Sequence, residues 1–140
     1  MSSRRSFTRF WKGELSDYWL PFDGVDSKLG SGSYGSVALA RRAGTSKLHA
    51  LKTIGKGKTP METINLEITC LAVFDHPNIV RLFEVVEDGT HVHIAMENAA
   101  GGSLYSYKNR HGPLAEQHVR LVMQHVLRAV RCIHWYGIRH

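Results

Sequence analysis

The sequence has 140 residues, 43% of them hydrophobic, with two cysteines and a formal net charge of +6. This composition excludes a disordered chain and a disulfide framework, and the length suits one compact domain or part of a larger one. The basic charge is concentrated near the two ends and no platform of aromatic and basic residues is evident, so we expect no nucleic-acid partner. No run approaches about 18 apolar residues, so we expect no transmembrane segment.

The start of the chain and its cysteines bear on location. The first residues lack the apolar run of a secretory signal. Cys70 and Cys132 lie in apolar sequence, which is typical of reduced residues in a core. We therefore expect an intracellular, cytoplasmic protein.

Residues 1–22 form a basic and aromatic extension. If the segment is helical, its apolar residues share one face: Phe7, Trp11, Leu15, Tyr18 and Trp19. This pattern is typical of an amphipathic helix that contacts a membrane surface, an import receptor or a partner protein. The alternative is a tail that packs on the domain through its aromatic side chains or stays disordered.

Two β-hairpins are predicted in residues 23–96. Val37–Arg41 and Leu48–Ile54 are rich in strand-forming residues and flank a short turn with Gly and Ser, which indicates the first hairpin. Ile79–Glu87 and His91–Met96 indicate the second hairpin, with an Asp-Gly pair at its turn.

A helix is predicted between these hairpins. Thr59 is a candidate N-cap, Pro60 suits the first helical position, and Glu62 would complete a capping box. Apolar residues then recur at helical spacing: Ile64, Ile68 and Leu71.

Residues 97–103 have the Ala, Gly and Ser content of a linker, and a second helix is predicted between Pro113 and Gly137. One stripe of that helix is apolar: Val119, Val122, Met123, Val126, Leu127 and Val130. The order of strand pair, helix, strand pair, linker and helices predicts an α+β fold.

A glycine-rich motif, G-x-G-x-x-G-x-V, extends from Gly30 to Val37. Glycines let a backbone approach phosphate oxygens without a Cβ in the way. A dinucleotide-binding fingerprint would open a helix, whereas residues from Val37 onward predict a strand, and no Gly-Lys-Ser/Thr follows as in a P-loop. The alternative is a plain glycine-rich hairpin turn.

Two charged residues occupy apolar faces of their predicted elements. Lys52 alternates with Leu48, Ala50 and Ile54 on one side of a strand, and Glu67 shares a helix face with apolar neighbours. Because an unpaired charge is costly on such a face, we expect Lys52 and Glu67 to form an ion pair. The alternative for Lys52 is an edge-strand lysine that reaches water.

In this order, the motifs resemble those of a eukaryotic protein kinase domain. Ala50-Leu51-Lys52 is similar to the family's Val-Ala-Ile-Lys strand, and Glu67 lies nine residues before a His-Pro-Asn-Ile-Val segment, as the family's helix-C glutamate does. Residues 76–85 and 101–104 are most similar to the calcium/calmodulin-dependent and calcium-dependent kinases. The resemblance implies a small lobe at residues 23–96, a hinge at 97–103, and the start of an incomplete large lobe at 104–140.

The resemblance also implies an ATP site. Lys52 would bind the α- and β-phosphates and Glu67 would hold Lys52, as the family's catalytic pair. Val37 and Ala50 would cover the adenine ring, with Met96 as gatekeeper. The implied nucleotide-binding residues are Leu29, Gly30, Ser31, Gly32, Ser33, Tyr34, Gly35, Val37, Ala50, Lys52, Met96, Glu97, Ala99 and Ser103.

The last residues are similar to the approach to the family's His-Arg-Asp loop, with His140 as its His. The catalytic Asp and the Mg²⁺ ligands of the full-length family would then lie beyond residue 140. We expect part of a Ser/Thr protein kinase whose partners are ATP and a protein substrate, and we expect these 140 residues to be inactive by themselves. The alternative is a truncated, catalytically dead fragment that acts as a nucleotide- or partner-binding module.

Overall fold

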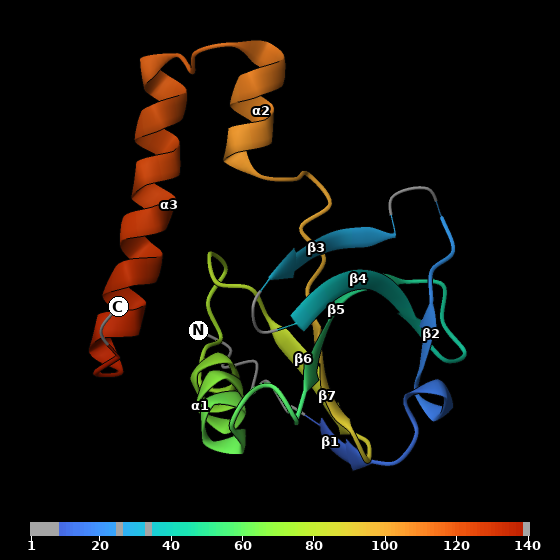
Figure 1. Ribbon diagram of the computed structural model, residues 1–140. Helices are drawn as coiled ribbons and strands as arrows, with labels where there is room; N and C mark the ends of the chain where they lie inside the picture. Colours follow the sequence, from blue (N-terminus) through green and yellow to red (C-terminus); the bar gives the residue numbers. More distant parts are fainter. Residues whose placement is uncertain (1–8, 25–26, 33–34, 139–140) are drawn as a thin grey trace. The chain divides into compact units, whose positions relative to one another are not determined.

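The computed structural model describes residues 9–24, 27–32 and 35–138 (Figure 1). The chain divides into two compact units, which we describe separately. The first comprises Met1–Asp75 and Arg81–Asn98, and the second comprises His76–Val80 and Ala99–His140. The first unit is a mixed sheet with one long helix and the second is helical, so the α+β prediction is confirmed.

A curled seven-stranded sheet forms the first unit, with strand order β1-β6-β7-β5-β4-β2 and β3 paired to β4. The strands are β1 (Arg9–Lys12), β2 (Trp19–Pro21), β3 (Lys28–Gly32), β4 (Gly35–Arg42), β5 (Leu48–Gly55), β6 (Leu82–Glu87) and β7 (His91–Met96). β1 is parallel to β6 and the other pairs are antiparallel. Both predicted hairpins are present. β6 begins later than predicted, because Ile79 donates its N–H to His76 O in a turn (3.1 Å).

Helix α1 (Met61–Ala72) packs on one face of the sheet. Ile64 and Ile68 join the buried core of that face, which also contains Ile54, Leu82, Val85, Val92 and Ile94. The predicted cap was wrong by one position. Pro60, with extended backbone, occupies the N-cap, and no side chain caps the helix. Thr59 is instead turned inward and buried.

The N-terminal segment covers the opposite face of the sheet. The helical interpretation of this segment was wrong for the described residues, which form β1, a 3₁₀ turn at Leu15–Asp17 and β2. Gly13 has φ +149, a conformation that a helix does not contain. The alternative of packing through aromatic side chains is confirmed, because Trp19 is buried in a second core cluster. Phe7 lies outside the described residues.

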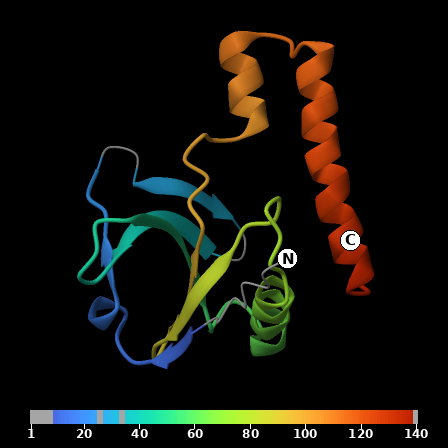
Figure 2. The same cartoon turned by 180° about the vertical axis from the view of Figure 1, so that it is seen from behind.

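That second cluster comprises Trp19, Ala40, Leu51, Val86 and Ala95, and Trp11, Leu15 and Tyr18 pack against it. Trp11 stacks on Tyr18 with ring centroids 5.2 Å apart. β1 pairs with β6 at the edge of the sheet, and the view from behind also shows the two strands side by side (Figure 2). Residues 9–22 of the extension are therefore part of the folded first unit.

The second unit contains α2 (Leu104–His111) and α3 (Glu116–Trp135). α3 is the helix predicted after Pro113, and the left-handed Gly137 follows its end. Its apolar stripe is largely exposed, with Leu127 at 60%. Within the described ranges, no helix has both the length and the apolar character needed to cross a membrane.

Candidate functional site

The predicted contact between Lys52 and Glu67 is present. Lys52 lies on β5, opposite Val37 of β4 and Ile94 of β7, and Glu67 lies on α1 between the buried Ile64 and Ile68. Packing of these isoleucines on the sheet brings the carboxylate to the lysine, with Nζ–Oε1 at 2.6 Å. The side chains are 22% and 33% exposed, so the pair is accessible to a solute.

This pair is too exposed to contribute much to folding. Ion pairs that retain contact with water stabilise proteins by about 0–1 kcal/mol. Its position, on a strand face that otherwise carries apolar residues, is thus poorly explained by stability alone. An ammonium group that a short ion-pair contact orients near the surface is suited to binding an anion.

The glycine motif forms the β3–β4 hairpin. Gly30 pairs with Val37, Ser31 with Ser36, and Gly32 with Gly35. Two predicted nucleotide-binding residues at the tip, Ser33 and Tyr34, lie outside the described residues.

The glycines of this hairpin have different roles. Gly35 has φ +147, and a Cβ there would collide with the backbone carbonyl of Thr53 on β5. A Cβ on Gly30 or Gly32 would meet no heavy atom of the described residues within 4 Å. Gly35 is therefore required for strand packing, whereas Gly30 and Gly32 border open space that fits a bound phosphate group.

Several predicted adenine-contacting residues share the face of Lys52. Ala50 pairs with Met96 of β7, and Val37 pairs with Lys52 itself. Directly paired residues of antiparallel strands point to the same face, and Ala50 and Lys52 are two positions apart on β5. The first unit thus brings Val37, Ala50, Lys52 and Met96 together. This apolar surface beside an ammonium group fits the base and phosphates of ATP.

The remaining predicted residues are not all brought to this face. Leu29 is about half exposed on β3. Glu97 donates its backbone N–H to Arg81 O (2.9 Å), so that donor is already engaged. Ala99 and Ser103 belong to the second unit, where Ser103 Oγ caps α2 by accepting the N–H of Ser106 (3.1 Å).

Among the described residues, no three His, Cys, Asp or Glu side chains are grouped as metal ligands.

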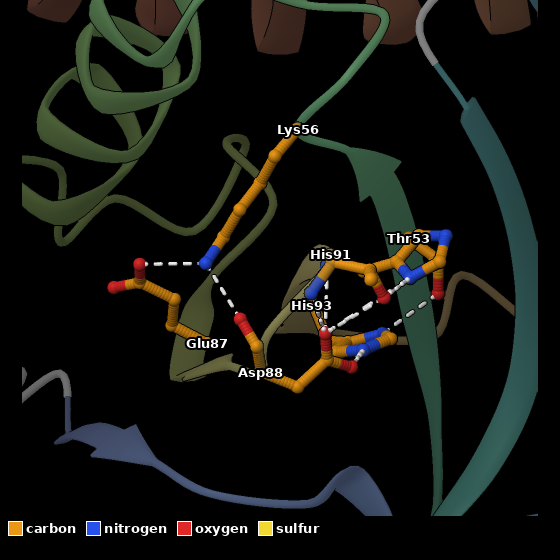
Figure 3. A network of polar contacts seen from close by, with 7 residues as sticks. Thr53, Lys56, Glu87, Asp88, His91 and His93 are labelled. Carbon is orange, nitrogen blue, oxygen red and sulfur yellow. Dashed lines mark hydrogen bonds and ion pairs between the residues drawn. The ribbon is translucent and has the colours of Figure 1, made fainter.

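A second polar network, which was not predicted from the sequence, lies at the far end of β5 and β7 (Figure 3). His93 Nε2 contacts Asp88 Oδ2 at 2.8 Å, and His93 Nδ1 contacts Thr53 Oγ1 at 3.0 Å. Asp88 Oδ1 also accepts the backbone N–H groups of Thr90 (2.7 Å) and His91 (2.6 Å). The one part of this network that the sequence indicated is the Asp-Gly turn, Asp88-Gly89.

Asp88 is the titratable centre of this network. Burial raises the pKa of its carboxyl group, but hydrogen bonds from His93 and from the backbone of Thr90 and His91 outweigh burial and hold the pKa well below its ordinary value. Lys56 pairs nearby with Glu87 Oε1 at 2.8 Å, and this bond lowers the Glu87 pKa. The network fastens the β6–β7 turn to β5.

The sheet, the Lys52–Glu67 pair and the glycine hairpin define the small lobe of a protein kinase. The model of the protein kinase domain family matches residues 24–140. The chain therefore belongs to the protein kinase domain family, as the sequence resemblance predicted.

Curated relatives are kinases of several kinds. The chain is 37% identical over 112 residues to the mitosis inducer protein kinase cdr1 of Schizosaccharomyces pombe, covering 80% of this chain and 18% of the relative. It is 34% identical over 129 residues to calcium-dependent protein kinase 5 of Plasmodium falciparum, covering 91% and 22%. It is 32% identical over 120 residues to CBL-interacting protein kinase 11 of Oryza sativa subsp. japonica, covering 83% and 24%. The chain thus spans about a fifth of the length of these relatives.

Proposed function

We propose that this chain is the ATP-binding part of a Ser/Thr protein kinase. The small lobe would be residues 23–96, the hinge 97–103 and the start of the large lobe 104–140. The observation that carries the proposal is the 2.6 Å contact between Lys52 and Glu67 on the strand face that also holds Val37, Ala50 and Met96. The Ser/Thr class of substrate rests on the sequence likeness to calcium-dependent kinases.

In this proposal the residues of the first unit bind and orient the nucleotide. Backbone N–H groups of the glycine hairpin approach the phosphates, and Val37 and Ala50 cover the base. Lys52 pairs with the α- and β-phosphates, and Glu67 keeps its ammonium group oriented. ATP supplies the phosphoryl group that the whole kinase transfers to a protein hydroxyl. An intracellular location follows from the use of ATP and agrees with the unpaired Cys70 and Cys132.

Nucleotide binding tests the proposal, with Lys52→Met as the variant. Lys56→Met is a matched control, because Lys56 also pairs with a glutamate, at 2.8 Å and with similar exposure. ATP is titrated into the ¹⁵N-labelled chain, and the amide signals of β4 and β5 are followed. We expect Lys52→Met to weaken binding about tenfold or more, since it removes a charge-assisted hydrogen bond, and Lys56→Met to change it little.

Two results would contradict the proposal. One is the absence of ATP-dependent shifts in β4 and β5 up to millimolar nucleotide. The other is an equal loss of affinity in the two lysine variants, which would attribute binding to general positive charge. Melting curves of both variants establish that the fold is retained.

A further inference from the structure

A half-open cavity of about 280 Å³ lies on the sheet face opposite Lys52. His49, Leu51 and Thr53 of β5 point to this face, whereas Ala50 and Lys52 point to the other. Residues from five strands line the cavity: Arg9, Trp19, Arg42, His49, Phe83 and Glu84. Two of these, Arg9 and Trp19, come from the N-terminal segment that precedes the kinase family match. The N-terminal segment therefore supplies part of the cavity wall.

Two residues that line the cavity each have a buried side-chain atom without a hydrogen-bond partner among the described residues. Trp19 is 1% exposed and its indole Nε1–H has no acceptor among the described residues. Glu84 is 4% exposed, and no described residue donates a hydrogen bond to its Oε2. Glu84 Oε1 is engaged by Arg42 Nε at 2.9 Å, with Arg9 Nη1 at 3.8 Å. Unsatisfied buried groups are costly, so a ligand that enters between these two side chains and both accepts and donates a hydrogen bond would satisfy them.

The surroundings of the cavity are cationic and aromatic. Arg42 uses only its Nε on Glu84, so the rest of its guanidinium group is available, and Arg9 is 61% exposed. The His49 ring meets both Trp19 and Phe83 edge-on, with centroids 5.0 Å apart in each case. Lys47 and Arg81 lie over Phe83 at 5.8 Å and 5.4 Å. Burial lowers the His49 pKa, which favours the neutral form of its imidazole ring.

We propose that this cavity, defined by Trp19, Arg42 and Glu84, docks an acidic peptide segment of a protein partner. A peptide backbone supplies both missing partners, a carbonyl oxygen for Trp19 Nε1–H and an N–H for Glu84 Oε2. An Asp or Glu side chain of the peptide pairs with the guanidinium N–H groups of Arg9 and Arg42 that Glu84 does not engage. The cavity holds one or two side chains rather than a whole cofactor, and its aromatic walls accept an apolar neighbour of the acid.

This interaction is independent of the nucleotide site, because the two sites occupy opposite faces of the sheet. Lys52→Met is expected to leave peptide binding unchanged. A failure of ATP binding would thus leave the docking proposal intact, and a failure of docking would leave the ATP site intact.

A peptide library tests the proposal on the full 140-residue chain. The probe is a positional-scanning set of fluorescein-labelled, C-terminally amidated hexapeptides, measured by fluorescence anisotropy. We expect selection for Asp or Glu next to an apolar position. Trp19→Phe removes one donor, and should weaken the best peptide about three- to tenfold. In ¹H–¹⁵N spectra the indole signal of Trp19, identified by its absence in Trp19→Phe, should shift on peptide addition.

Arginine variants separate this site from general charge attraction. The Arg9 side chain is mostly exposed, so Arg9→Gln should retain the fold while weakening peptide binding. Arg42→Gln should weaken peptide binding by about tenfold. Arg41 is exposed on β4 and points to the sheet face away from the cavity. Arg41→Gln removes the same charge and should change the affinity for the peptide less than about twofold.

Three outcomes would overturn the proposal. The first is no acidic preference in the library, as expected if water alone fills the cavity. The second is an acidic preference that Trp19→Phe and Arg9→Gln leave unchanged, since this would reflect only attraction to a basic chain. The third is peptide binding without any shift of the Trp19 indole signal.

Discussion

Gly35→Ala should destabilise the first unit far more than alanine at the other glycines of the hairpin. At Gly35 the backbone has φ +147, where a residue with a Cβ pays about 1–3 kcal/mol. The added methyl group would also collide with Thr53 O and lie 3.1 Å from Thr53 C. Crowding of this kind in packed structure costs about 1–3 kcal/mol more. We therefore expect a loss of about 2–6 kcal/mol in the free energy of unfolding.

Urea unfolding measures this loss if the signal reports the first unit alone. Trp135 belongs to the second unit and is 87% exposed, so Trp135→Phe gives a background in which Trp11 and Trp19 are the only tryptophans. Gly30→Ala and Gly32→Ala are the matched controls, because a Cβ there meets no described atom within 4 Å. They should change stability by less than about 1 kcal/mol.

The three alanine variants also separate folding from ligand binding. Under the proposed function, Gly30→Ala and Gly32→Ala should weaken ATP binding while keeping the urea midpoint. An equal loss of stability at all three glycines would refute the assignment of Gly35 as the packing glycine. So would a Gly35→Ala protein that is as stable as the parent.

Three further predictions concern the acid network, the chemistry and the second unit. Asp88→Asn should destabilise the first unit at pH 7 by about 1–3 kcal/mol, as measured by urea unfolding. Because the pKa of Asp88 is depressed in the folded state, the stability difference between the two proteins should shrink as the pH falls below about 4. The 140 residues alone should transfer no radiolabelled phosphate to a mixed Ser/Thr peptide library, with Lys52→Met as the control for contaminating kinase, whereas fusion to a related kinase's large lobe should produce Lys52-dependent transfer. Wild-type transfer without fusion, abolished in Lys52→Met, would contradict this expectation. The chain should bind a hydrophobic dye through the exposed stripe of α3, and charged replacements at Val126 and Leu127 should reduce the dye signal; an unchanged signal would place the dye elsewhere.

Features with strong local chemistry were predictable from the sequence. Period-2 alternation and the turn residues located β4 and β5, and the two charges on apolar faces predicted the Lys52–Glu67 contact before any geometry was known. α2 was missed, although its signals are ordinary: Ser103 at the N-cap and the left-handed Gly112 after the last turn. The segment lacks the apolar stripe by which periodicity indicates a helix.

Other features depend on pairing between distant segments, which local patterns do not encode. The aromatic residues of the N-terminal segment fit a helical wheel. Strands form instead, because Gly13 has a non-helical backbone conformation and β1 pairs with an edge of β6 that would otherwise have no partner strand. The cavity beside Trp19 and the link from Asp88 through His93 to Thr53 each combine several strands. Their registers are set by tertiary packing, so no single stretch of sequence reveals them.

The parallel pairing of β1 with β6 means that the boundary of the family match is not the boundary of the folded unit. The match begins at residue 24, yet β1 and β2 lie before it and Trp19 is 1% exposed. A chain trimmed to the matched region would lose this indole, leaving a hollow between β4 and β6, and would expose the edge of β6 to other strands. Unprotected edges of this kind promote intermolecular pairing. The described part of the N-terminal segment thus protects a sheet edge of this chain.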